Sequence, residues 1–476
     1  MGADPTSQEP RAPTGGTELQ IRQLGAVLSL GFVIAILGLG YWSLVRAQAL
    51  VSRTDNPRLI EAERRIQRGD ILDRRGRPVV VSQPGDKGTW NRSYLVPEMA
   101  PVVGYSSIDY GTSGIERAYD AQIRGEQPTT AIQKLWADLL HLHSSGVSVT
   151  LTIDADVQRL ASQALGDRVG AVVVLGVPDG EVIAMASQPT FDPNTLEADL
   201  PRLQSDLRKP MLNRAVQGLY PPGLIFETIT LAAAMQQGLA GPSTVFTDDL
   251  GVILTVDPPI SCPSNPPATR FTLAEAYTWP CSVLFARLGL DLGGERLADY
   301  ATQFGVGRPT GLPIDAATGQ LLARGVWSNL IAARTAMGQG EVLVTPLEMG
   351  MVAATIANDG VRPVPALVLT VDGQTPSPPA APRQVLDKQI AQQLRTILAE
   401  SFAVGQRSAA LPAADLAGRA GSADSGMPGA PPHAWFIGFA PVAQPRYAIA
   451  VIVEHGNQGW EVAAPIAIQV LAALKD

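Results

Sequence analysis

The longest apolar run in the chain lies near its start. Residues 23–45 contain no charged side chain, and a helix of that length spans a hydrocarbon core of about 30 Å. A cleaved signal peptide is the alternative, but its apolar region would be shorter, and no convincing small-residue cleavage site is present. The pattern predicts an uncleaved transmembrane anchor over residues 21–46. It follows a polar tail over residues 1–20 that we expect to be disordered.

Between residues 47 and 146, short apolar runs are interrupted by turn signals. The run PVVVS (78–82) stands between RRGRP (74–78) and QPGDKG (83–88). Gly and Pro in such clusters separate strands from one another. The pattern predicts a small N-terminal module that contains short strands.

From residue 147 onward the periodicities become longer and more regular. Residues 147–154 alternate as a strand does, and residues 155–166 carry apolar side chains at helical spacing. Two apolar runs, 169–177 and 181–187, flank the dipeptide Asp179-Gly180. That arrangement predicts a β-hairpin.

The last third of the chain continues this alternation of helices and strands. We expect a helix over 387–402, antiparallel strands over 434–442 and 446–454, and a final helix over about 464–474. Such an order predicts an α+β fold, an antiparallel sheet flanked by helices, in a domain over residues 147–476.

The composition indicates a folded protein and argues against nucleic-acid binding. Of the 476 residues, 46% are hydrophobic and 17% are charged, which is typical of folded proteins. The formal net charge of −8, without a basic cluster, argues against nucleic acid as a partner.

The histidines and cysteines add little chemistry. His141 and His143 stand at strand spacing without another candidate ligand, so we predict no metal site. Cys262 and Cys281 are the only cysteines. The sequence leaves open whether they form a free buried pair or a disulfide, which would require an oxidising compartment.

Motifs along most of the chain resemble those of one family. They are NPR (56–58), RGDILDRRGRPVV (68–80), GIERAYDAQIRG (114–125), GAVVVLGVPDGEVIAMASQPTFDPN (170–194), NRAVQGLYPPG (213–223), MGQGEVLVTPLEMGMVAATIANDGVRP (337–363) and HAWFIGFAP (433–441). In this order they resemble the class B penicillin-binding proteins, transpeptidases that cross-link peptidoglycan outside the membrane.

The resemblance implies an architecture and a location. The C-terminal domain would have the penicillin-binding protein/serine β-lactamase-like transpeptidase fold, including a helical subdomain. Residues 47–146 would be the dimerisation or pedestal module. The tail would be cytoplasmic and both modules extracytoplasmic. A membrane-embedded glycan polymerase or another cell-wall synthesis protein would be the partner, and no cofactor is implied. The resemblance also favours a disulfide between Cys262 and Cys281.

Three motifs build the active site of that family. They are a serine with a lysine three residues later, a Ser-x-Asn triplet and a Lys-Thr-Gly triplet. At these positions the chain has Leu224 and Glu227, then Pro280-Cys281-Ser282, then Arg419-Ala420-Gly421.

These replacements remove the chemistry that the family uses. Leucine has no hydroxyl to acylate, and an anionic Glu227 cannot act as the lysine does. In the family both motif lysines point into one cleft, so Glu227 and Arg419 would meet there. We predict that they form an ion pair with Leu224 packed beneath. The alternative is two separate solvated charges.

The sequence therefore favours a catalytically inactive homologue that acts as a scaffold or regulator in cell-wall elongation or division. One alternative is a D,D-transpeptidase with unconventional catalytic residues, for which Thr228 and Ser282 are the nearest hydroxyls. Another is a sensor of peptidoglycan stem peptides, with Arg419 and Ser422 as a ligand-binding remnant.

Overall fold

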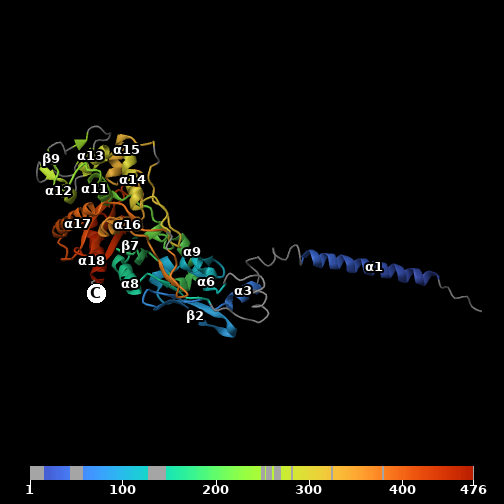
Figure 1. The fold of residues 1–476 in the computed structure, drawn as a ribbon. Helices are drawn as coiled ribbons and strands as arrows, with labels where there is room; N and C mark the ends of the chain where they lie inside the picture. The colour runs from blue at the N-terminus through green and yellow to red at the C-terminus, as the bar shows by residue number, and fades with distance from the viewer. Residues whose placement is uncertain are drawn as a thin grey trace, which may run out of the picture. The chain divides into compact units, whose positions relative to one another are not determined.

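The structure of the protein is a computed structural model. It describes residues 15–42, 57–126, 146–247, 252–253, 260–261, 270–279, 282–322, 325–377 and 380–474. The chain falls into two units, residues 1–65 and 66–476 (Figure 1).

The first unit contains the helices α1 (Gly15–Gly40) and α3 (Pro57–Arg64). Within α1, residues Leu19–Gly40 are long and apolar enough to cross a membrane, and their side chains are exposed or half-buried. This helix fits a single-pass anchor. It begins at Gly15, inside the stretch for which the sequence predicted a disordered tail. The polar residues before the apolar run extend the helix because they continue its backbone hydrogen bonding.

A five-stranded antiparallel sheet forms the centre of the second unit. Its strand order is β16-β17-β18-β7-β8. The strands are β7 (Gly170–Gly176), β8 (Val182–Gln188), β16 (Ala417–Ala423), β17 (His433–Ala440) and β18 (Tyr447–Val453). The predicted hairpin and the predicted strand pair near the C-terminus are both confirmed.

Helices cover both faces of this sheet (Figure 1). Val172 and Val174 pack on the side of α8 (Ala155–Leu165) and α18 (Gly459–Ala472). Ala171 and Val173, from the alternate positions, pack on the side of α16 (Pro346–Ala357). Because successive residues of a strand point to opposite faces, the apolar runs of the central strands serve both layers.

Helices assemble into a subdomain beside the edge strand β16. They are α11 (Glu227–Gln236), α12 (Leu273–Thr278), α13 (Ser282–Leu292), α14 (Gly294–Phe304) and α15 (Asn329–Ala336). Helix α17 (Lys388–Ser408) lies against both α12 and β16. The α+β class and the helical subdomain are therefore as predicted.

A second five-stranded sheet joins the two predicted modules. Its order is β14-β6-β1-β2-β3. The strands are β1 (Ile71–Leu72), β2 (Pro78–Pro84), β3 (Trp90–Tyr94), β6 (Val149–Leu151) and β14 (Val368–Val371). Because β6 and β14 come from residues after 146, this sheet links the two predicted modules within the unit of residues 66–476.

A buried charge cluster stabilises the N-terminal part of this unit. Glu116 on α5 (Gly114–Ala118) is fully buried. It accepts hydrogen bonds from Arg68 Nη2 at 2.8 Å and from Arg92 Nε at 2.6 Å. Two guanidinium groups thus compensate one carboxylate, as a charge removed from water requires.

Shorter elements complete the described part of the chain. They are η2 (Asp86–Gly88), η3 (Pro97–Met99), α4 (Ala100–Val103), β4 (Ser106–Ser107), β5 (Gly111–Thr112), α6 (Asp120–Ile123), η4 (Pro193–Thr195), α9 (Leu196–Ser205), α10 (Arg214–Gln217), η5 (Gly223–Phe226), β9 (Val245–Thr247), β10 (Val252–Ile253), β11 (Ile260–Ser261), β12 (Arg270–Thr272), β13 (Val361–Arg362) and β15 (Arg383–Gln384).

Candidate functional site

The turn before helix α11 is fixed by hydrogen bonds from three directions. The backbone N–H of Tyr220 donates to the carbonyl of Val344 at 3.0 Å, and that of Gly223 donates to the carbonyl of Gly338 at 2.8 Å. The indole of Trp435 donates to the carbonyl of Pro221 at 3.0 Å. The rigid turn places η5 and the first turn of α11 beside strand β16.

Leu224 occupies the space between this turn and the edge strand. Its side chain is half-buried. A methyl group built on Gly421 of β16 would lie 2.9 Å from Leu224 Cβ, so only glycine allows this close approach. The sequence predicted that Leu224 packs beneath the Glu227–Arg419 pair, and the structure places it against Gly421 of the strand.

Glu227 and Arg419 form the predicted ion pair. Arg419 Nη2 lies 3.0 Å from Glu227 Oε2, and both side chains are almost completely buried. The alternative of two separate solvated charges is therefore wrong. The pair links the first turn of α11 to the third residue of β16.

Tyr277 of helix α12 supplies the rest of the environment of Arg419. Its carbonyl oxygen accepts a hydrogen bond from Arg419 Nη1. The centroid of its ring lies 4.7 Å from the guanidinium carbon, in a cation–π arrangement. The Tyr277 hydroxyl is hydrogen-bonded to that of Thr228 at 2.7 Å. No motif or periodicity in the sequence pointed to Tyr277, because its role depends on packing between separate helices.

Burial dominates the electrostatics of the pair. Loss of solvent raises the pKa of the Glu227 carboxyl to about 7, although the charge of Arg419 and the hydroxyl of Ser282 act in the opposite direction. Within the described structure, Glu227 Oε1 and Arg419 Nε are buried without a hydrogen-bond partner. The two charges of the ion pair are close, but each group keeps one buried polar atom without a hydrogen bond. The charged form of the carboxylate is therefore costly in free energy of folding.

The other positions of the second and third motifs lie nearby. Ser282 is the first residue of α13, close to the Glu227 carboxylate. Ala420 and Gly421 are buried in β16. The hydroxyl of Ser422 donates to the carbonyl of Asn457 at 2.8 Å. Arg419 and Ser422, the predicted ligand-binding remnant, therefore both already have partners inside the protein.

Some predicted positions lie outside the described residues. These are Pro280, Cys262, Cys281, His141 and His143. The disulfide therefore stays a prediction.

No group of three His, Cys, Asp or Glu side chains suited to a metal ion is present among the residues that the structure describes. His433 is buried, and its Nδ1 accepts the backbone N–H of His455 at 3.1 Å.

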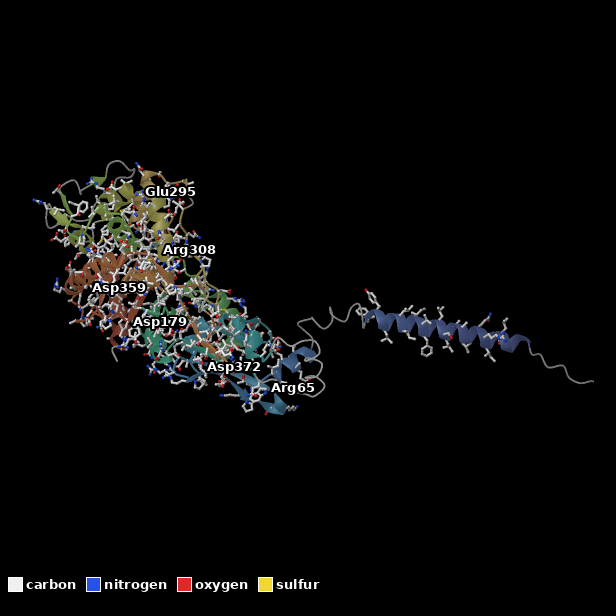
Figure 2. The ribbon with its side chains drawn as sticks, viewed as in Figure 1. Arg65, Asp179, Glu295, Arg308, Asp359 and Asp372 are labelled. Atoms are coloured by element: carbon white, nitrogen blue, oxygen red, sulfur yellow. The ribbon has the colours of Figure 1, made fainter. Side chains whose placement is uncertain are left out.

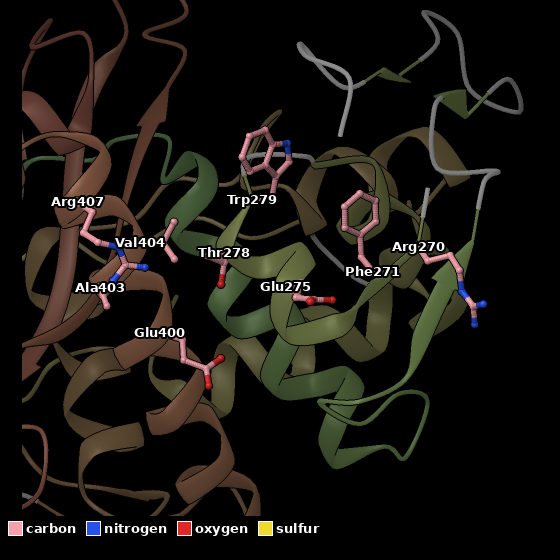
Figure 3. A pocket seen from close by; sticks show the side chains of 9 residues that line it. All are labelled: Arg270, Phe271, Glu275, Thr278, Trp279, Glu400, Ala403, Val404 and Arg407. Carbon is pink, nitrogen blue, oxygen red and sulfur yellow. The ribbon is translucent and has the colours of Figure 1, made fainter. Parts of the chain in front are cut away.

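A separate pocket of about 550 Å³ opens between helices α12 and α17 (Figure 3). Both aromatic and charged side chains line it. The lining residues are Arg270, Phe271, Glu275, Thr278, Trp279, Glu400, Ala403, Val404 and Arg407. None of them is a position of the three motifs.

Two family descriptions match the chain. Residues 170–472 match the penicillin binding protein transpeptidase domain, and residues 68–149 match the penicillin binding protein A dimerisation domain. The chain belongs to the penicillin-binding protein family. The resemblance inferred from the motifs is confirmed.

Relatives of this penicillin-binding protein are named as cell-wall enzymes. The peptidoglycan D,D-transpeptidase PbpA of Mycolicibacterium smegmatis is 32% identical over 95% of this chain and 98% of its own. The peptidoglycan D,D-transpeptidase MrdA of Haemophilus influenzae is 26% identical over 76% of this chain and 62% of its own.

A solved structure shows the same fold. It is penicillin-binding protein A from M. tuberculosis as an imipenem acyl-enzyme complex, with a TM-score of 0.78 and 30% identity. The match covers 87% of this chain and 100% of the chain in that structure.

We expect the two members of the buried ion pair to depend strongly on each other. Glu227→Gln leaves Arg419 buried without its counter-charge, and Arg419→Met leaves the carboxylate alone. Arg419→Met should lower the free energy of unfolding by about 3–5 kcal/mol above pH 7, where Glu227 is ionised. Glu227→Gln should cost less, because burial already favours the neutral carboxyl. The double substitution should cost clearly less than the sum of the two, because it leaves no lone buried charge. Urea unfolding of the four proteins measures the coupling, and additive costs would contradict it.

The raised pKa of Glu227 predicts a pH dependence of stability. Between the ordinary glutamate pKa of 4.5 and the folded-state pKa of about 7, the folded protein binds a proton that the unfolded chain releases. The stability of the native protein relative to Glu227→Gln should therefore fall as the pH rises through this interval, by at most about 1.4 kcal/mol per pH unit. Denaturant unfolding of both proteins between pH 5 and 8 measures the difference. A relative stability that rises with pH would show that the attraction to Arg419 outweighs desolvation.

Proposed function

We propose that this penicillin-binding protein is non-catalytic and acts as a membrane-anchored scaffold or regulator in peptidoglycan synthesis. The observation that carries the proposal is the buried Glu227–Arg419 pair, with Leu224 beside it. These residues occupy the positions where the family resemblance expects the nucleophile and two lysines. At the two lysine positions, Glu227 and Arg419 instead bind one another.

The neighbouring groups offer no replacement chemistry. The Thr228 hydroxyl is buried and bonded to Tyr277. Ser282 lies next to a carboxylate whose partner is Arg419. The sequence contains no lysine between Lys209 and Lys388. Since removal of the nucleophile alone costs a serine protease a factor on the order of 10⁶ in turnover, we expect no residual acyl transfer.

The geometry also argues against a sensor that uses the old cleft. A peptide carboxylate would need an accessible cation, but the side chain of Arg419 is only 3% exposed and already paired. It would also meet the negative charge of Glu227. Binding to other proteins is therefore the function that we favour.

We further propose a membrane topology and assign the partner contacts to particular segments of the chain. Residues 1–20 would be cytoplasmic, residues 21–46 would span the membrane, and residues 47–146 and 147–476 would lie outside. The anchor and the N-terminal module would contact a membrane-embedded glycan polymerase that serves elongation or division, and thereby cell shape. The buried charge cluster at Glu116 stabilises the interior of that module.

A fluorescent penicillin tests the absence of catalysis. We expect the purified full-length chain to show no covalent band after incubation and denaturing electrophoresis, because position 224 has no oxygen. Penicillin-binding protein A from M. tuberculosis, known as a penicillin G acyl-enzyme complex, is the positive control. A covalent band on this chain would refute the proposal and support unconventional catalysis.

Affinity purification tests the scaffold role. We expect the tagged full-length chain, extracted from native membranes, to enrich a glycan polymerase over an unrelated tagged single-pass protein. A variant whose span Leu19–Gly40 is replaced by an unrelated apolar helix of the same length should recover less. Quantitative mass spectrometry measures the ratio. Equal recovery with the unrelated protein would contradict the role.

A further inference from the structure

Two arginines face each other across a short ladder in the transpeptidase-like region. Strand β13 pairs with β15 in antiparallel register, and Arg362 stands directly opposite Arg383. Side chains at directly opposite positions have Cβ atoms about 5 Å apart, and like charges there are destabilising. This arrangement requires either a compensating anion or a cost in stability.

Arg308 places a third guanidinium group near that of Arg362. It follows the C-terminus of helix α14 (Figure 2), and its Nε donates to the carbonyl of Thr302 at 3.0 Å. Arg362 Nη1 donates to the next carbonyl, that of Gln303, at 3.1 Å. A methyl group built on Gly305 would lie 3.3 Å from Arg362 Nη1, so the glycine leaves room for this approach.

The charges of Arg308 and Arg383 both act on Arg362. The pKa of Arg362 is lowered first by burial and then by the charges of Arg308 and Arg383. Arg308 and Arg383 are exposed, and Arg362 is half-buried. Solvent and solutes therefore reach the cluster from outside.

Nearby carboxylates do not neutralise this cluster. None of the three arginines has an ion pair with a described acidic residue. Asp359 is occupied by Lys388 at 3.0 Å and by Arg395 at 3.1 Å. Glu348 accepts the backbone N–H groups of Gly307 and Gly319. In a chain of net charge −8, an uncompensated group of arginines is not explained by a general excess of basic residues.

We propose that Arg308, Arg362 and Arg383 form a binding site for a phosphate-bearing anion. Guanidinium groups present pairs of N–H donors that match phosphate oxygens, and several of them together suit a dianion better than a single carboxylate. Each guanidinium keeps donors that no described residue uses. A bound phosphate would remove the repulsion across the β13–β15 ladder, so binding and local stability would be coupled. The site is separate from the Glu227–Arg419 pair and does not depend on its chemistry.

Thermal unfolding of the full-length chain tests this site with inorganic phosphate as the probe. At constant ionic strength, replacement of chloride by phosphate should raise the Tm of the native protein. Arg383→Gln should weaken the apparent phosphate affinity roughly tenfold or more, while its Tm in chloride stays equal or rises. Arg296→Gln, an exposed arginine on α14 with the same change in charge, should respond as the native protein does.

A charge reversal provides the sharper comparison. Arg383→Glu places a carboxylate opposite Arg362 and should raise the Tm in chloride while it abolishes the response to phosphate. Glycerol phosphate and micelles that contain phosphatidylglycerol then distinguish a soluble phosphate ester from a lipid headgroup. The proposal is overturned if phosphate acts no more strongly than chloride, if Arg296→Gln loses the response equally, or if an acidic peptide binds in preference to phosphate.

Discussion

The buried pair of Glu227 and Arg419 is the interaction on which the site depends. It joins the start of α11 to the edge strand β16, and Tyr277 joins the same arginine to α12. The helical subdomain and the sheet are thereby tied together at the motif positions. A buried pair of this kind contributes little net stability, but the loss of either member is costly.

The scaffold that holds this pair keeps the architecture of the active relatives. Both faces of the central sheet are covered by helices, and the strand β14 closes the second sheet across the boundary between the modules. Hydrogen bonds fix the turn before Leu224 on three sides. The chemistry of the site can change while the fold remains, because the backbone hydrogen bonds that fix the turn do not involve the motif side chains.

Charged side chains occur in two contrasting environments in this protein. At Glu227 and Glu116, buried carboxylates are matched by arginines within hydrogen-bonding distance. At Arg308, Arg362 and Arg383, cations gather on the surface without a described carboxylate partner. The paired charges are compatible with the folded core, because a charge removed from solvent must be paired. An uncompensated surface group is instead available to a ligand.

The sequence by itself determined the class of fold, the apolar anchor, the hairpin at 170–188 and the pairing of Glu227 with Arg419. These follow from periodicity and from motif spacing, both of which are local or tied to a known family pattern. Tertiary structure decided the rest. Helix α18 begins at Gly459, ahead of its predicted start near 464, and α17 continues to Ser408, where Trp460 packs against Gly405. The role of Tyr277 and the meeting of the three arginines arise from elements distant in sequence, so no local pattern encodes them.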